Sequence, residues 1–254
     1  MNLKINKSIK KSSIWLIAGI LLFVSIGFAD KEMDTMVCGD VIIQITNQYD
    51  NYFIDEEDII DIISHEGNLA LVGNYVENLN LRSLETSLKN EKFIKDAQVY
   101  KDLKGNIIVT AVQRRPVARI SRPDAPDAYI DEEGTILPLS DKFTSRVMLI
   151  TGKYVDEFVE YGITDENKNY LDLIIRIESD PFWRAQVSQL DIEKSGEINV
   201  YPQVSKQIIE FGFPEDLDIK FKKMEIFYKE ILPFKGWNTY ARVNLKYHDQ
   251  IICE

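Results

Sequence analysis

The sequence predicts an α+β protein with a single N-terminal transmembrane helix, a β-α-α-β-β domain and a mainly antiparallel β domain with helices. Three observations predict this class: an uncharged apolar run near the start, two amphipathic helix patterns flanked by strand patterns, and many short strand patterns separated by turn residues. Hydrophobic residues make up 45% of the 254 residues, so the chain can bury a sizeable core.

The apolar run covers Ile14 to Ala29 and follows a basic tail, residues 1–13, which carries lysines and no acid. A helix over this run would rise about 24 Å at ~1.5 Å per residue, so flanking serines and lysines would have to complete a span over residues 14–30. By the positive-inside rule the tail is cytoplasmic and the rest is exported. A cleaved signal peptide fits the same residues, because small residues precede Asp30.

Residues 40–115 carry the pattern of one compact domain. Asp55 and Asn80 are suitable N-cap residues, each followed by apolar residues at helical spacing. Two amphipathic helices on one face of a three-stranded sheet would bury a common core. In order, we expect a strand at Asp40–Ile45, helices at Asp55–Gly67 and Asn80–Asn90, a strand around Ala97 and Val99, and a strand at Ile107–Val112. Arg114-Arg115-Pro116 closes the unit, since proline cannot continue an interior strand.

Residues 116–254 form a second, β-rich domain. The pattern predicts one hairpin whose strands, Ala128–Ile130 and Thr135–Leu137, are joined by the turn that ends at Gly134. It predicts another hairpin around Ser195-Gly196 and a strand at Val147–Ile150. Helical spacing appears at Tyr170–Ile177 and at Leu217–Leu232, where Phe221, Met224, Phe227 and Tyr228 share a face. Ala241–Tyr247 and Ile251-Ile252 are the last expected strands.

The composition argues against several kinds of site. After the basic tail, acidic residues outnumber basic ones by fifteen, which disfavours binding to a phosphate backbone. Two cysteines, Cys38 and Cys253, and two histidines are too few for a disulfide framework or a zinc site, although these two cysteines could pair outside the cytoplasm. No nucleophile elbow, phosphate loop or zinc helix motif is present, so we expect no enzyme activity, no cofactor and no metal.

Several motifs together resemble a known family. The segment Val112-Gln113-Arg114-Arg115-Pro116-Val117-Ala118 is similar to the E-R-x-P-x-A junction of the FtsQ/DivIB division proteins, with Gln113 in place of the acid. Tyr129-Ile130-Asp131 with Gly134 and Ile136-Leu137 looks like the first hairpin of their β domain, and the β-α-α-β-β unit resembles a POTRA domain. The closing stretch from Gly236 looks most like the Bacteroidetes branch.

The resemblance implies a non-catalytic scaffold of the division machinery. Such a scaffold is a single-pass inner-membrane protein with a cytoplasmic N-terminus and a periplasmic C-terminal domain. It would bind single-span partners of the FtsB and FtsL type through the edge of its last strand and help to recruit and regulate the septal peptidoglycan synthases. By motif, the partner-binding residues would be Lys246, Tyr247, Asp249, Gln250 and Ile251. Tyr247 would be the aromatic anchor and Lys246 a charge partner for an acidic helix.

Two other functions remain open from the sequence. A chaperone of envelope or secretion assembly also carries POTRA units, usually in tandem, whereas this sequence holds one. A membrane-anchored envelope enzyme would need a catalytic constellation that the sequence does not display.

Overall fold

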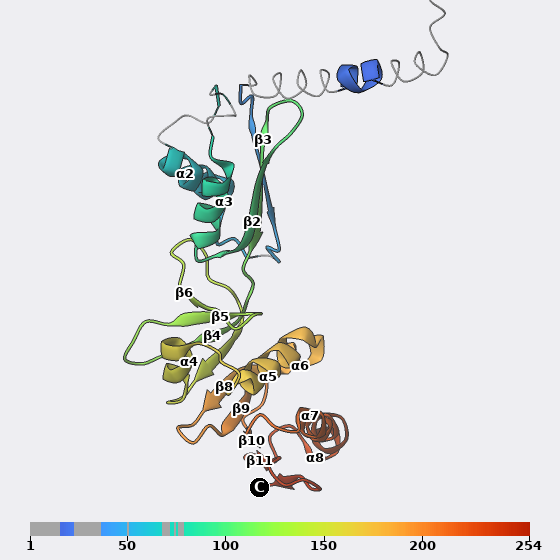
Figure 1. Cartoon of the computed structure of the whole chain (residues 1–254). Coiled ribbons are helices and arrows are strands. Elements are labelled where there is room, and N and C mark those ends of the chain that lie inside the picture. The colour runs from blue at the N-terminus through green and yellow to red at the C-terminus, as the bar shows by residue number, and fades with distance from the viewer. Residues whose placement is uncertain (1–15, 23–36, 50, 68–71, 74, 76–78) are drawn as a thin grey trace, which may run out of the picture. The chain divides into compact units, whose positions relative to one another are not determined.

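The computed structural model describes the chain except residues 1–15, 23–36, 50, 68–71, 74 and 76–78. The described residues divide into two compact units (Figure 1). The first unit comprises the described residues within 1–46 and 54–113, and the second comprises those within 47–53 and 114–254. The expected domain at 40–115 therefore includes residues 47–53, which belong to the second unit by their contacts.

Most of the predicted transmembrane segment and basic tail lie outside the described residues. Residues 16–22 of that segment are helical, with exposed apolar side chains. Within the ranges that the structure describes, no helix combines the length and the apolar character needed to cross a membrane.

The first unit has the predicted order of elements. Its strands are β1 (Val41–Thr46), β2 (Ile94–Lys101) and β3 (Ile107–Gln113), and its helices are α2 (Glu56–Gly67) and α3 (Leu81–Asn90). The sheet has the order β1-β3-β2, with β1 parallel and β2 antiparallel to the central β3. The two helices contact one another and lie along the sheet (Figure 1).

Local sequence explains where these helices begin. The carboxylate of Asp55 accepts a hydrogen bond from the Asp58 N–H at 2.9 Å, and the Asp58 carboxylate accepts one from the Asp55 N–H at 3.1 Å. This reciprocal cap satisfies two of the N–H groups that a helix start leaves unpaired. Asn80 caps α3 in the predicted way, because its side chain accepts from the Ser83 N–H at 3.1 Å.

The helices and the sheet of the first unit share one apolar core. Ile59 and Ile63 of α2, and Leu84 and Leu88 of α3, are buried. α2 lies against β1 and α3 against β2, and the buried side chains of the central β3 all fall on one face. The predicted β-α-α-β-β unit is thus confirmed element by element.

The second unit is built on one large mixed sheet. Among the described residues this sheet has the order β12-β11-β10-β9-β8-β7-β4-β5-β6. Neighbours pair antiparallel except β4–β7, β7–β8 and β10–β11, which are parallel. The strands are β4 (Pro116–Ile120), β5 (Ala128–Asp131), β6 (Ile136–Pro138), β7 (Met148–Thr151), β8 (Val187–Ile192), β9 (Ile198–Pro202), β10 (Ile208–Gly212), β11 (Arg242–Asn244) and β12 (Ile252–Cys253).

Helices complete the core of the second unit. They are α4 (Val155–Tyr161), α5 (Lys168–Ser179), α6 (Pro181–Gln186), α7 (Leu217–Ile226), a π-helical segment (Phe227–Ile231) and α8 (Leu232–Lys235). Phe221, Met224, Phe227 and Tyr228 are buried on one face, as their spacing predicts. Asp180 ends α5 and caps α6, accepting from the Phe182 N–H at 2.8 Å.

Pro116 has a different role from the one expected. It opens β4, which lies between β5 and β7 inside the sheet, so the residues that close the first unit also start the second. A proline is tolerated there because it is the first residue of the strand, next to a break in register between Pro116 and Ala118.

Candidate partner-binding site

The last two strands form one edge of the large sheet. β11 pairs in parallel with β10 on one side and antiparallel with β12 on the other, so β12 is the edge strand. The Glu254 N–H donates to the Arg242 carbonyl at 2.9 Å and the Arg242 N–H donates back at 3.0 Å. Because an antiparallel ladder alternates, the N–H and C=O of Cys253 point away from β11, toward the open side.

The predicted strand at Ala241–Tyr247 is shorter than expected. It ends at Asn244, and residues 245–251 form a loop that returns the chain to β12. The prediction that this strand continues to Tyr247 is therefore wrong, although the loop still lies beside the sheet edge. The strand stops where the Asn244 side chain accepts a hydrogen bond from the Lys246 N–H at 2.9 Å, a local contact that competes with the ladder.

A buried lysine on α7 fixes this loop. Lys223 is only 8% exposed. Its ammonium donates to the Leu245 carbonyl at 3.1 Å and also to the Tyr247 carbonyl. Leu245 itself is fully buried, so the first part of the loop is held by both packing and hydrogen bonds.

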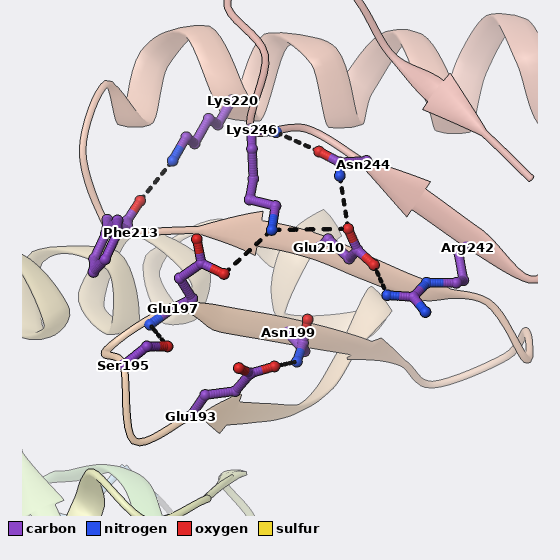
Figure 2. Close-up of polar contacts among 10 residues, drawn as sticks. All are labelled: Glu193, Ser195, Glu197, Asn199, Glu210, Phe213, Lys220, Arg242, Asn244 and Lys246. Carbon is purple, nitrogen blue, oxygen red and sulfur yellow. Dashed lines mark hydrogen bonds and ion pairs between the residues drawn. The ribbon is translucent and has the colours of Figure 1, made fainter.

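Lys246 does not extend freely into solvent. Its ammonium lies 3.2 Å from a carboxylate oxygen of Glu197 and 4.0 Å from one of Glu210 (Figure 2). Its side chain crosses Gly212, where a β-carbon would approach Lys246 Cγ to 2.9 Å. The charge expected to meet a partner is thus compensated within the chain.

Glu210 of β10 is the centre of this polar network. Its carboxylate pairs with the guanidinium of Arg242 and accepts from the Asn244 side chain at 2.7 Å (Figure 2). The hydrogen bond from Arg242 to Glu210 raises the pKa of the Arg242 guanidinium above its ordinary value. These contacts link β10 to β11 and to the loop through side chains as well as through the backbone.

A second lysine supports the neighbouring turn. Lys220 is 9% exposed, and its ammonium donates to the Phe213 carbonyl at 2.5 Å (Figure 2). Burial lowers the pKa of Lys220 below its ordinary value. Lys220 and Lys223 were not predicted as site residues, yet both lie in helical phase with the buried Met224 and Phe227. The sequence did contain a signal for these two lysines, because a charged residue on an otherwise apolar helix face is unusual and indicates a buried polar contact.

The remaining predicted residues differ in exposure. Tyr247 is 52% exposed. The Asp249 side chain is 92% exposed and pairs with the His248 ring at 2.7 Å. Gln250 is exposed, whereas Ile251 packs partly against the core. The structure therefore brings the five predicted residues to one loop but gives them different environments.

A shallow groove runs beside the loop. Its volume is 560 Å³, and it is lined by α7 and by residues 248–251. Ile219 and Ile226 of α7 and Ile251 of the loop supply the apolar part of its lining, while Asp218, Lys222 and Asp249 supply charges. A groove of this composition next to an open strand edge can accept an amphipathic segment of another chain.

β2 forms one edge of the small sheet, and this edge is less accessible than the β12 edge. The register of the β2–β3 ladder turns the Val99 N–H outward, and this group donates to a carboxylate oxygen of Glu85 at 3.4 Å. Lys89 bridges Glu85 and Asp96, with both distances at 2.9 Å. Such acidic cover on an edge strand opposes strand addition, so the β12 edge is a better candidate for partner binding than the β2 edge.

The described residues give no sign of a metal centre. No group of three or more histidine, cysteine, aspartate or glutamate side chains in the described part of the chain could hold a metal ion. Cys38 and Cys253 are both free thiols.

The described residues form an α+β protein in which a small β-α-α-β-β unit is joined to a large mixed sheet with an open edge at β12. Comparison with known families agrees with this fold class. Residues 115–254 match the family model FtsQ/DivIB, C-terminal related, and residues 36–112 match the POTRA-like domain. The first match covers more than half of the chain, so the protein belongs to the FtsQ/DivIB-related family. No curated protein sequence matches the chain.

Proposed function

We propose that this protein is a non-catalytic scaffold of the bacterial division machinery. It is anchored in the inner membrane by residues 14–30, with residues 1–13 in the cytoplasm, and it presents a POTRA-like domain at residues 40–115 and a β domain at residues 116–254 in the periplasm. It binds single-span partners of the FtsB and FtsL type and, through them, helps to recruit and regulate the septal peptidoglycan synthases. The family match and the POTRA-like match support a divisome-type scaffold.

The open edge of β12 carries the proposal. The outward N–H and C=O of Cys253 can pair with a strand of the partner, which would extend the sheet by one strand. Lys246, Tyr247, Asp249, Gln250 and Ile251 then lie in the loop that leads into this edge. In this arrangement the backbone of β12 supplies affinity, and the exposed Tyr247 ring with the groove beside α7 supplies specificity.

The sharpest test removes one backbone donor. Cys253→Pro deletes the outward N–H, while the ladder bonds to β11 come from the neighbouring residues and stay in place. The matched control is Cys253→Ala, which removes the thiol but keeps the N–H. The full-length protein is co-expressed with a tagged FtsB/FtsL-type partner, and capture from membranes is measured together with thermal unfolding.

We expect the proline variant to lose capture and the alanine variant to retain it, with similar melting temperatures. Equal capture by the two variants would show that the β12 edge is not used. Failure of the wild-type chain to capture any division protein would contradict the proposed scaffold function itself.

A further inference from the structure

The second unit holds a groove that is unrelated to the β12 edge. Its volume is 690 Å³, and its walls come from Tyr49 and Asn51, the start of β4, the stretch before β7, and the ends of α5 and α6. Three arginines line it: Arg115 before β4, Arg146 before β7, and Arg184 on α6. Among the described residues that line this groove, Glu178 alone carries a carboxylate.

The three arginines differ in whether a carboxylate neutralises their charge. The guanidiniums of Arg115 and Arg184 approach the same oxygen of Glu178, at 3.3 Å and 3.6 Å. Arg146 is exposed, and no carboxylate of the described residues pairs with it. The described residues that line the groove therefore carry an excess of positive charge, although the chain as a whole has a net charge of −11. Concave surfaces lined by one sign of charge concentrate the field and attract the opposite charge.

One arginine is already fixed in position. The Arg115 guanidinium lies over the Tyr49 ring, 4.6 Å from its centroid, and its side chain is only 25% exposed. The ring contact and the Glu178 pair hold the planar donor group before any ligand arrives. Arg184 and Arg146 are more exposed and can turn toward a ligand.

The stretch from Phe143 to Arg146, which forms one wall of the groove, is held by contacts with other parts of the second unit. The Ser145 hydroxyl donates to the Asn51 side chain at 2.6 Å, and the Ser145 N–H donates to the Tyr129 hydroxyl at 3.1 Å. The Phe143 ring packs edge-on against Phe53 at 5.3 Å between centroids. These contacts fix the stretch that carries Arg146 and give the groove an apolar flank at Phe143.

We propose that this groove binds an acidic polypeptide segment, one that carries two or more carboxylates. The arginines come from three separate parts of the chain, and the volume exceeds what a single carboxylate or phosphate group would fill. Guanidinium groups pair with carboxylates through two parallel hydrogen bonds, and clusters of arginine are a recurrent means of recognising acidic motifs. Tyr49 and Phe143 would pack against the aliphatic parts of such a segment.

The test uses the full-length protein in a non-ionic detergent and a fluorescent hexaglutamate peptide as the probe, with hexaglutamine for comparison. Fluorescence anisotropy gives the dissociation constant for the wild type and for the double variant Arg146→Gln, Arg184→Gln. Arg115 is left unchanged, because its contacts also support the fold. The control is Arg82→Gln, which removes an exposed positive charge from α3 of the first unit.

We expect hexaglutamate, but not hexaglutamine, to bind the wild type, and the double variant to bind it at least about tenfold more weakly. The Arg82→Gln protein should bind as the wild type does, and all three proteins should melt at similar temperatures. Equal affinity of the double variant and the wild type would overturn the proposal. Binding of inorganic phosphate or of phosphatidylglycerol vesicles without binding of hexaglutamate would also overturn it.

Discussion

Lys223 of α7 donates a hydrogen bond from its ammonium to the backbone carbonyl of Tyr247. A buried residue of a core helix thereby fixes the backbone that carries an exposed aromatic ring of the candidate site. The same ammonium also holds the Leu245 carbonyl, so the loop is positioned before a partner arrives. Binding then avoids part of the entropy cost of ordering a flexible loop.

Replacing Lys223 by Met is expected to weaken both folding and partner capture. The variant keeps the aliphatic volume but leaves two carbonyls of the loop without their donor. Loss of charged hydrogen bonds of this kind costs about 2 kcal/mol. Thermal unfolding measures the stability, and co-purification with the partner measures capture. Unchanged capture would show that the loop needs no support from α7.

Tyr247→Ala should reduce capture without reducing stability, because Tyr247 is 52% exposed. If Tyr247 is an aromatic anchor, its removal costs about 2 kcal/mol of binding energy or more, close to a thirtyfold loss of affinity. The control is Tyr161→Ala, since Tyr161 is another exposed tyrosine of the second unit, at 68%. Equal capture by both variants would remove Tyr247 from the site.

Lys246→Gln should affect capture less than Tyr247→Ala does. The ammonium of Lys246 already pairs with Glu197 in the free protein, so a partner would have to compete with that contact. Pairs of this exposure contribute about 0–1 kcal/mol to folding, so the melting temperature should change little. A loss of capture larger than that of Tyr247→Ala would show that Lys246 exchanges Glu197 for an acid of the partner.

Asp127 should make stability depend on pH. Burial raises the pKa of Asp127, but the hydrogen bonds from Arg119 and from the Arg122 N–H outweigh it and leave this pKa below the ordinary value. A carboxyl with a lowered native pKa stabilises the fold above the unfolded pKa and loses that contribution as pH falls through the native pKa. Asp127→Asn should therefore melt below the wild type at neutral pH, and the difference should shrink below about pH 4. The exposed Asp141→Asn serves as the control.

Gly152→Ala should prevent the second unit from folding normally. Gly152 follows β7 with φ +105°, and a β-carbon there would lie 2.0 Å from the Ile192 carbonyl oxygen. Backbone strain of this kind costs about 1–3 kcal/mol before the steric clash is counted. The matched control is Gly162→Ala, which has φ +77° but no atom within 4 Å of the added carbon. Equal melting temperatures for the two variants would contradict the predicted clash.

Local patterns predicted the first unit well. Asn80, Leu84 and Leu88 each do what their spacing indicates, because capping and helix burial depend on neighbours within one or two turns. The second unit was harder to predict, because α4 and β10 are short and their patterns are weak. The parallel pairs β4–β7 and β7–β8 join segments far apart in sequence, which no local period can indicate.

The sequence supported a hypothesis for the candidate site residues but not for the contacts that hold them. The sequence indicated that Lys246 and Tyr247 lie near the sheet edge. It did not indicate that Glu197, on the β8–β9 hairpin, pairs with the ammonium of Lys246. Nor did it indicate that Lys223 of α7 holds the loop by a hydrogen bond to the Tyr247 carbonyl. Both contacts join residues more than twenty positions apart, so they follow from the tertiary fold and not from a local pattern.

The 47–53 segment leaves the first unit after β1 and returns to it as α2, yet its own side chains belong to the second unit. Phe53 packs against Tyr129 and Phe143, and Asn51 bonds to Ser145. A gene fragment that starts at Arg114 would therefore encode the large sheet without part of its core. Exchange of either unit between related genes as one uninterrupted block would leave this segment on the wrong side of the cut, so the two units are expected to be inherited together.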